Sequence, residues 1–172
     1  SSPWLADTKA IIEPGRFLVN EAGIYVARVT RVKRSRGKIY AVIDGGMHHH
    51  LAASGNLGQT IKRQSPLGIL HEIDVPHSAD LVGIGGPLCT PLDTIGRSIS
   101  LPSIEAGDLV GVFQSGAYAR AASPLGFLSH PTPAEVLVSE NDAHLIRRRG
   151  TVGDLLIDQQ LESTNTDSTD TD

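Results

Sequence analysis

The first side chain that could do chemistry is Arg16, which ends a Pro14-Gly15-Arg16 turn near the start of the chain. A guanidinium group grips a carboxylate or phosphate through two parallel hydrogen bonds. Gly15 lets the backbone approach an anion, because glycine has no Cβ. The turn is a candidate anion-binding site, although Pro-Gly is a common turn dipeptide and, taken alone, more often serves only as a turn.

The only cysteine, Cys89, lies in a stretch rich in glycine and proline, which predicts a loop after a strand at residues 81–84. A lone cysteine is most often a small buried apolar side chain. At a reaction centre, its thiol could instead return a proton to a carbon atom. One cysteine cannot form an internal disulfide, so we expect a reducing compartment and cytoplasmic localisation.

Tyr118 and a run of three histidines are the remaining candidates. Tyr118 follows a Gly-Ala turn and could offer its hydroxyl to a phosphate, although packing is the commoner role. His48 and His50 would share one face of a strand, like the metal ligands of cupin barrels, but the glutamate that completes the cupin pattern is absent. We expect no metal; a cofactor- or substrate-facing role for one histidine and simple packing both stay open.

Turn residues and short apolar stretches set the expected fold. Eighteen glycines and ten prolines punctuate the chain, which predicts a mainly β domain. We expect strands at residues 24–33, 38–44, 67–73, 81–84, 98–101, 108–114, 135–138 and 144–148. Because closing a sheet removes its exposed edges, strands at this spacing favour a small β-barrel or sandwich with short flanking helices.

The flanking segments have their own patterns. Residues 17–23 suit a short helix after the Pro-Gly-Arg turn. Apolar side chains recur at helical spacing in residues 151–161, and Asp154 lies in the first turn, where a negative charge suits the helix dipole. From Ser163 onward only Ser, Thr, Asn and Asp occur, a composition that cannot bury enough apolar surface to order itself.

Size and charge exclude several classes of function. The 172 residues, 40% of them hydrophobic, suffice for one core. The formal net charge of -4 and the shortness of the basic run at residues 147–149 predict no nucleic-acid partner. No apolar run approaches the length of a membrane span, so we expect no membrane partner either.

Taken together and in this order, these segments resemble the C-terminal part of the pyridoxal-phosphate-dependent decarboxylases of the diaminopimelate and ornithine decarboxylase family. The matching positions are Glu13, Pro14, Gly15, Arg16, Asp44, Gly45, Gly46, Met47, Gly86, Pro87, Cys89, Asp93, Gly116, Ala117 and Tyr118. The resemblance implies a Greek-key-like barrel similar to the C-terminal domain of alanine racemase, and pyridoxal 5'-phosphate as cofactor. It also implies a separate N-terminal α/β barrel that carries the Schiff-base lysine. None of the chain's four lysines has a matching context.

The resemblance also assigns roles to side chains. It implies that Arg16 binds substrate near the cofactor phosphate, and that residues 13–16 together with Tyr118 contact the cofactor. Cys89 would return a proton to the α-carbon after carbon dioxide leaves, across the interface of a homodimer. Asp93 would take part in substrate binding.

The departures from the family bear on the substrate. Thr90 and Pro91 replace the usual Glu-Ser, which removes a carboxylate for a substrate amine. Ala52 and Asn56 fall where diaminopimelate decarboxylases hold the far end of their substrate with arginine and tyrosine. The run from His48 onward resembles a subgroup found in butirosin-type biosynthesis and beside exosortase systems. That resemblance implies an amino acid or an aminoacyl group tethered to a carrier protein as substrate.

These expectations give a domain plan and two alternatives. Residues 1–16 would end the N-terminal barrel, 17–150 would form the C-terminal β-barrel, 151–162 a helix and 163–172 a disordered tail. Without the lysine-bearing domain, the chain would be inactive alone. The alternatives are a non-catalytic interaction module that pairs with a decarboxylase protomer, and a cupin-like metal-binding barrel.

Overall fold

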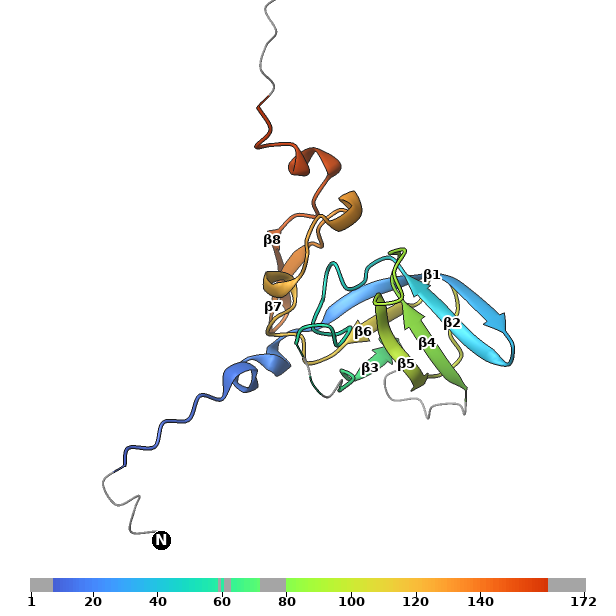
Figure 1. The fold of residues 1–172 in the computed structure, drawn as a ribbon, viewed down its shortest axis with the longest axis horizontal. Helices are drawn as coiled ribbons and strands as arrows, with labels where there is room; N and C mark the ends of the chain where they lie inside the picture. Colours follow the sequence, from blue (N-terminus) through green and yellow to red (C-terminus); the bar gives the residue numbers. More distant parts are fainter. Residues whose placement is uncertain (1–7, 59, 61–62, 72–79, 161–172) are drawn as a thin grey trace, which may run out of the picture. The chain divides into compact units, whose positions relative to one another are not determined.

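The computed structural model describes residues 8–58, 60, 63–71 and 80–160. The chain divides into two compact units, Ser1–Leu125 and Gly126–Asp172. The first unit contains a six-stranded sheet and the second a two-stranded one (Figure 1). The chain is therefore mainly β, as its turn residues and short apolar stretches predict.

The sheet of the first unit curls into a nearly closed barrel. Its strands are β1 (Tyr25–Ser35), β2 (Lys38–Ile43), β3 (Leu67–Ile69), β4 (Leu81–Gly85), β5 (Thr94–Ser100) and β6 (Leu109–Val112). They follow the order β3-β6-β1-β2-β4-β5, in which β2 and β4 run parallel and every other neighbouring pair runs antiparallel. The predicted barrel is confirmed.

All six predicted strands of this unit form; their ends differ from the predicted ones by one or two residues in four of them and by more in β3 and β5. β5 begins at Thr94, four residues before its predicted start, because its first half pairs with the end of β4. β3 ends at Ile69, and residues 72–73 of the predicted strand lie outside the described residues. The pairing of each strand with its neighbours, which local pattern does not encode, sets these ends.

The β1–β2 hairpin has a two-residue turn. Ser35 pairs with Lys38, so Arg36 and Gly37 alone form the loop. Both have positive φ, 52° and 72°, the backbone of the type I′ turn whose twist matches that of the flanking strands. Gly37 suits this conformation at no steric cost.

The barrel interior is built by alternation along the strands. On β2, Ile39, Ala41 and Ile43 are buried, whereas Lys38 and Tyr40 point outward. The same inward faces of the other strands, together with loop residues, complete one core. Its members are Ala27, Val29, Ile39, Ala41, Ile43, Ala53, Ile69, Val82, Ile84, Ile95, Ile99, Leu101, Ile104, Val110 and Val112.

The predicted helices are shorter than expected. Residues 17–23 form two 3-10 helices, η2 (Gly15–Leu18) and η3 (Asn20–Ala22). The predicted helix at 151–161 is only the 3-10 helix η6 (Val152–Leu155), and residues 156–160 continue without helix. Thr151 and Asp154 form a capping box there, but Leu155 and Leu156 stay exposed, and a short helix without a packed face is marginal.

The remaining elements lie in loops and in the second unit. η4 (Arg120–Ala122) ends the first unit, and the second contains η5 (Phe127–Ser129), β7 (Glu135–Ser139) and β8 (Asp142–Arg147). The antiparallel β7–β8 pair matches the two strands predicted there. Within the described residues, no helix is long and apolar enough to cross a membrane.

Candidate functional site

The Gly-Ala-Tyr turn is bonded through its backbone to the segment at residues 20–23, which follows the Arg16 turn. The Ser115 N–H donates to the Gly23 carbonyl (2.8 Å), and the Gly116 N–H donates to the Asn20 carbonyl (2.9 Å). A Cβ on Gly116 would overlap with the Val19 carbonyl oxygen, so only glycine permits this approach. The Gly-Ala-Tyr motif is therefore needed for close backbone contact as well as for its tyrosine.

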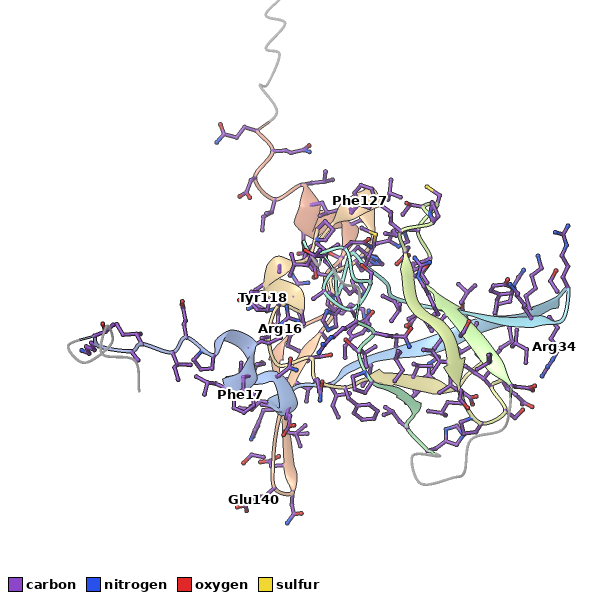
Figure 2. All side chains as sticks on the ribbon, turned by 60° about the horizontal axis from the view of Figure 1, so that its bottom comes forward. Arg16, Phe17, Arg34, Tyr118, Phe127 and Glu140 are labelled. Atoms are coloured by element: carbon purple, nitrogen blue, oxygen red, sulfur yellow. The ribbon has the colours of Figure 1, made fainter. Side chains whose placement is uncertain are left out.

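This contact brings the side chains of Arg16 and Tyr118 together. The Arg16 guanidinium carbon lies 4.9 Å from the centroid of the Tyr118 ring, a cation–π contact (Figure 2). Gly15 and Tyr118 both have left-handed backbone, with φ of 57° and 56°. Glu13, Pro14, Gly15 and Arg16 are all exposed, and Tyr118 is 47% exposed. The predicted anion-binding turn is thus at the surface, with its guanidinium accessible to a ligand.

The buried His50 holds the Gly-Ala-Tyr turn in place through a hydrogen bond to Ser115. His50 Nε2 lies 3.0 Å from Ser115 Oγ, whose own hydrogen is donated to the Val112 carbonyl (2.8 Å). The ring must therefore donate through Nε2–H, while its Nδ1 accepts the Ala53 N–H (3.4 Å). These contacts select one neutral tautomer of His50.

The surroundings of His50 also favour its neutral form. Burial, and to a lesser extent the nearby positive charge of Arg16, lowers the pKa of His50 from 6.5 to about 4. A proton on Nδ1 would in addition face the Ala53 N–H. At neutral pH His50 is an uncharged donor that holds Ser115, rather than a second cation beside Arg16 that competes with it for an anionic ligand.

The histidine run lies in a turn, so His48 and His50 lack the shared strand face that the cupin-like alternative requires. β2 ends at Ile43, and the N–H groups of His49 and His50 both donate to the Gly46 carbonyl. All three rings are buried, at 1%, 4% and 2% exposure. Among the described residues, no three His, Cys, Asp or Glu side chains are grouped to hold a metal, which leaves the cupin-like alternative without support there.

Tyr25 from β1 packs against the same run. Its hydroxyl lies 3.1 Å from His49 Nδ1, and its ring meets the His50 ring edge-on at 5.7 Å between centroids. A Cβ on Gly45 would overlap with that hydroxyl, so the glycine makes room for the tyrosine. The Asp-Gly-Gly-Met segment therefore seats the histidines against the barrel.

Asp93, predicted to bind substrate, is almost fully buried and its carboxylate joins two loops. Oδ1 accepts the Met47 N–H (2.7 Å), and Oδ2 accepts the Leu88 N–H (2.9 Å). A Cβ on either Gly46 or Gly86 would overlap with this carboxylate. The geometry favours a positioning role, in which Asp93 fixes the loop that follows β2 to the loop that follows β4.

The second of these loops carries Cys89, which is free and exposed. The loop closes on itself through the Gly86 N–H, which donates to the Asp93 carbonyl (3.0 Å). Asn56 ties it to the histidine segment, because its amide nitrogen donates to the Leu92 carbonyl (2.9 Å) and to Ser54 Oγ (2.7 Å). The thiol is therefore accessible on a loop that is fixed at its base.

We call the segments 13–23, 44–56, 86–93 and 114–118 the loop junction. The hydrogen bonds and ring contact above link them, although they are far apart in the sequence. Sequence reasoning missed His50 and Ser115 as braces within this junction. The available signal was weak: a serine precedes the Gly-Ala-Tyr turn, and its partner is 65 residues away.

The junction and the barrel together define a class of domain. Residues 16–116 match the sequence profile of the pyridoxal-dependent decarboxylase C-terminal sheet domain. The chain therefore belongs to the pyridoxal-dependent decarboxylase family of ornithine, diaminopimelate and arginine decarboxylases, as the resemblance of its motifs predicts.

Particular relatives refine this assignment. The chain is 43% identical over 159 residues to an L-glutamyl acyl-carrier-protein decarboxylase of Niallia circulans, covering 91% of this chain and 37% of that one. It is 32% identical over 158 residues to the diaminopimelate decarboxylase of Zymomonas mobilis, covering 88% of this chain and 34% of that one. The chain thus spans about a third of the length of these relatives.

Solved structures agree with this assignment. The diaminopimelate decarboxylase of M. jannaschii superposes with a TM-score of 0.74 at 27% identity, covering 88% of this chain and 33% of that one. In its complex with L-lysine the TM-score is 0.73. The fold of the matched third is that of a decarboxylase C-terminal domain.

Proposed function

We propose that this chain is the C-terminal portion of a pyridoxal-phosphate-dependent decarboxylase that acts on an aminoacyl group tethered to a carrier protein. The observation that carries the proposal is the loop junction, which joins Arg16 and Tyr118 and fixes the base of the Cys89 loop. Family membership supports decarboxylation. The acyl-carrier-protein relative supports a tethered substrate.

The departures within the junction support the tethered substrate further. Ala52 is 5% exposed and has no polar group to offer a distant substrate end. Asn56 uses its amide nitrogen for Ser54 and Leu92. A substrate joined to a carrier by a thioester needs no grip on a second free amino-acid head, so both positions suit it.

The residues of this chain fit the anionic groups of pyridoxal phosphate, but none of the lysines in the described part of the chain lies in the loop junction. The exposed Arg16, next to the left-handed Gly15, suits a phosphate or carboxylate. Among the described lysines, Lys33 and Lys38 lie on the β1–β2 hairpin and Lys9 lies ahead of η2. The N-terminal barrel implied by the relatives would provide the lysine, so the chain alone is inactive.

Each side chain of the junction has one task in this proposal. Pyridoxal phosphate, when bound, supplies an electron sink that stabilises the charge left on the α-carbon after carbon dioxide departs. Arg16 binds the anionic group of substrate or cofactor, and the Tyr118 ring holds its guanidinium in place. The Cys89 thiol gives its proton to the α-carbon. Asp93 fixes the loop that presents the thiol.

Exposed apolar side chains offer surfaces for the rest of the enzyme. Near the start of the chain, Phe17 and Leu18 are 79% and 75% exposed. In the second unit, Val138, Leu145 and Ile146 are 70%, 64% and 63% exposed. Apolar surface of this extent marks interaction sites. We assign the patch of the second unit to the N-terminal barrel, and the patch at Phe17 and Leu18 to the second subunit of a homodimer.

The test is complementation. The chain is mixed with the separately expressed N-terminal barrel of the Niallia circulans relative, pyridoxal phosphate and a glutamylated acyl-carrier protein. Carbon dioxide release from the mixture, and from neither protein alone, is the expected result. If the two proteins associate and the cofactor binds without any release, the chain is a non-catalytic interaction module instead.

A further inference from the structure

The β1–β2 hairpin concentrates positive charge on a chain whose formal net charge is -4. Five exposed cations and no acidic residue occur in residues 31–38. They are Arg31, Lys33, Arg34, Arg36 and Lys38. Asp80 lies 4.0 Å from Arg34, but both side chains are at least 60% exposed, so water screens this pair. The hairpin therefore remains a basic surface.

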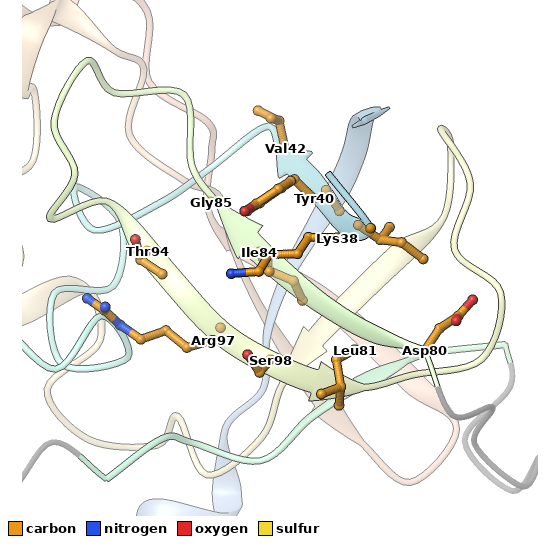
Figure 3. A pocket seen from close by; sticks show the side chains of 15 residues that line it. Lys38, Tyr40, Val42, Asp80, Leu81, Ile84, Gly85, Thr94, Arg97 and Ser98 are labelled. Carbon is orange, nitrogen blue, oxygen red and sulfur yellow. The ribbon is translucent and has the colours of Figure 1, made fainter. Parts of the chain in front are cut away.

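A groove begins at this hairpin and runs along the outer face of the barrel. Its main part has a volume of about 880 Å³ and lies over β2, β4 and β5 (Figure 3). A second hollow of about 310 Å³ continues it beside Arg34 and Arg36. Lys38, Ile39 and Asp80 line both hollows, so the groove and the basic hairpin are continuous.

Glycines on the outward face of β4 keep the groove open. Tyr40 pairs with Gly83, and Val42 pairs with Gly85, in the parallel β2–β4 ladder. A Cβ on Gly83 would lie 3.2 Å from the Tyr40 ring, so the bare backbone lets that ring lie beside it. Figure 3 shows Tyr40 and Lys38 reaching across β4. The floor is therefore glycine backbone overlaid by an aromatic ring, a surface that suits the packing of an extended chain.

The far end of the groove is the base of the Cys89 loop. Gly85 is the last residue of β4 and Thr94 is the first of β5, and both line the groove. The loop 86–93 that joins them carries the thiol. A chain laid along β4 would travel roughly 13 Å from the hairpin to this loop. The groove thus runs from the basic surface to the base of the loop that carries the candidate proton donor.

We propose that the hairpin binds the acidic surface of the carrier protein and that the groove takes the extended arm bearing its aminoacyl group. This inference rests on the proposed function and adds the docking surface for its substrate. Charge complementarity selects the occupant, because exposed cations steer and orient an acidic partner. A nucleic-acid surface is disfavoured by the chain's pI of about 5.9 and by the single aromatic side chain in the groove.

The test measures binding, which needs neither cofactor nor the N-terminal barrel. The 172-residue chain is titrated with the acyl-carrier protein on which the Niallia circulans relative acts, with and without its arm. Reversing two groove cations, Arg34→Glu with Lys38→Glu, should weaken binding of both carrier forms at least tenfold. The matched control, Lys9→Glu with Arg149→Glu, changes the net charge equally on exposed side chains outside the groove and should leave affinity within about twofold.

A second variant separates the groove from the charge. Gly83→Val points outward on β4, where its Cβ would meet the movable Tyr40 ring closely and the Ile39 carbonyl oxygen only at an ordinary contact distance of 3.9 Å, so the fold should persist, as circular dichroism would check. It should abolish the tighter binding of the arm-bearing carrier and leave binding of the arm-free carrier unchanged. If Gly83→Val has no effect on either form, the groove does not take the arm.

Other occupants give different results. Absence of carrier binding, equal weakening by the control pair, or tighter hairpin-dependent binding of a single-stranded RNA would each overturn the proposal. So would a hairpin-dependent dimer in sedimentation, which would assign the surface to a second copy. Carrier binding without carbon dioxide release in the complementation assay would refute the proposed function while supporting this docking surface. Carbon dioxide release that is insensitive to the β1–β2 hairpin variants would support the proposed function and refute this docking surface.

Discussion

The loop junction buries polar side chains, whereas the β7–β8 hairpin exposes apolar ones. In the junction, polar side chains such as Asp93 and His50 are buried, and backbone groups or a serine satisfy them. In the hairpin, apolar side chains such as Val138 and Leu145 are exposed. The junction is completed by contacts within its own unit, whereas the hairpin has the surface of an element that needs a partner.

Removing the Asp93 carboxylate from the loop junction should have the largest effect on stability. Asp93→Ala leaves the N–H groups of Met47 and Leu88 without their acceptor, and the free energy of unfolding should fall by about 3–5 kcal/mol. The control is Asp142→Ala in the β7–β8 hairpin. The Asp142 carboxylate contacts exposed groups, and its loss should lower the free energy of unfolding by less than about 1 kcal/mol. Chemical denaturation measures both, and similar costs would contradict the contrast.

The pH dependence of stability should report on the protonation of His50. Its pKa is lower in the folded chain, about 4, than in the unfolded one, 6.5, so the unfolded state binds the extra proton between these values. Stability therefore falls as pH drops from 6.5 to 4, by up to about 3 kcal/mol from this group. His50→Gln, which can still donate to Ser115, should flatten that part of the pH profile. An unchanged profile would show that His50 is not held neutral.

A substitution on the exposed apolar face of the β7–β8 hairpin should weaken association and leave the stability of the chain almost unchanged. Val138→Ser should change the free energy of unfolding by less than about 0.5 kcal/mol, because the side chain is 70% exposed. The same change should weaken association with the N-terminal barrel by about tenfold, since it removes apolar area from the proposed interface. Asn141→Ser, at the polar turn between the two strands, is the control for association. Loss of stability without loss of association would place Val138 in an internal core.

Local pattern was sufficient for much of the fold. Alternating residues such as Ile39 and Ala41 encode a strand with one buried face, and Arg36-Gly37 encodes a tight hairpin turn. The length of the C-terminal helix could not be predicted this way, because helical spacing at Leu155 and Leu156 stabilises a helix only when that face is packed.

The site was predictable only in part. Motif order identified Arg16, Cys89 and Tyr118 as candidates, but the contacts that position them join distant residues. Asp93 reaches Met47 across 46 positions, and His50 reaches Ser115 across 65. Neither pairing leaves a local signal, so the sequence does not show that Asp93 joins two loops, and its role in substrate binding stays a prediction.

In the proposed reaction the Cys89 thiol gives its proton to the α-carbon after carbon dioxide leaves. The most direct test compares wild type with Cys89→Ala in the complemented enzyme, and uses Leu92→Ala, an exposed change in the same loop, as control. We predict that carbon dioxide release slows about 10²–10⁴-fold in Cys89→Ala alone, while cofactor absorbance is retained. Equal rates in Cys89→Ala and wild type would contradict the claim and remove the thiol from the mechanism.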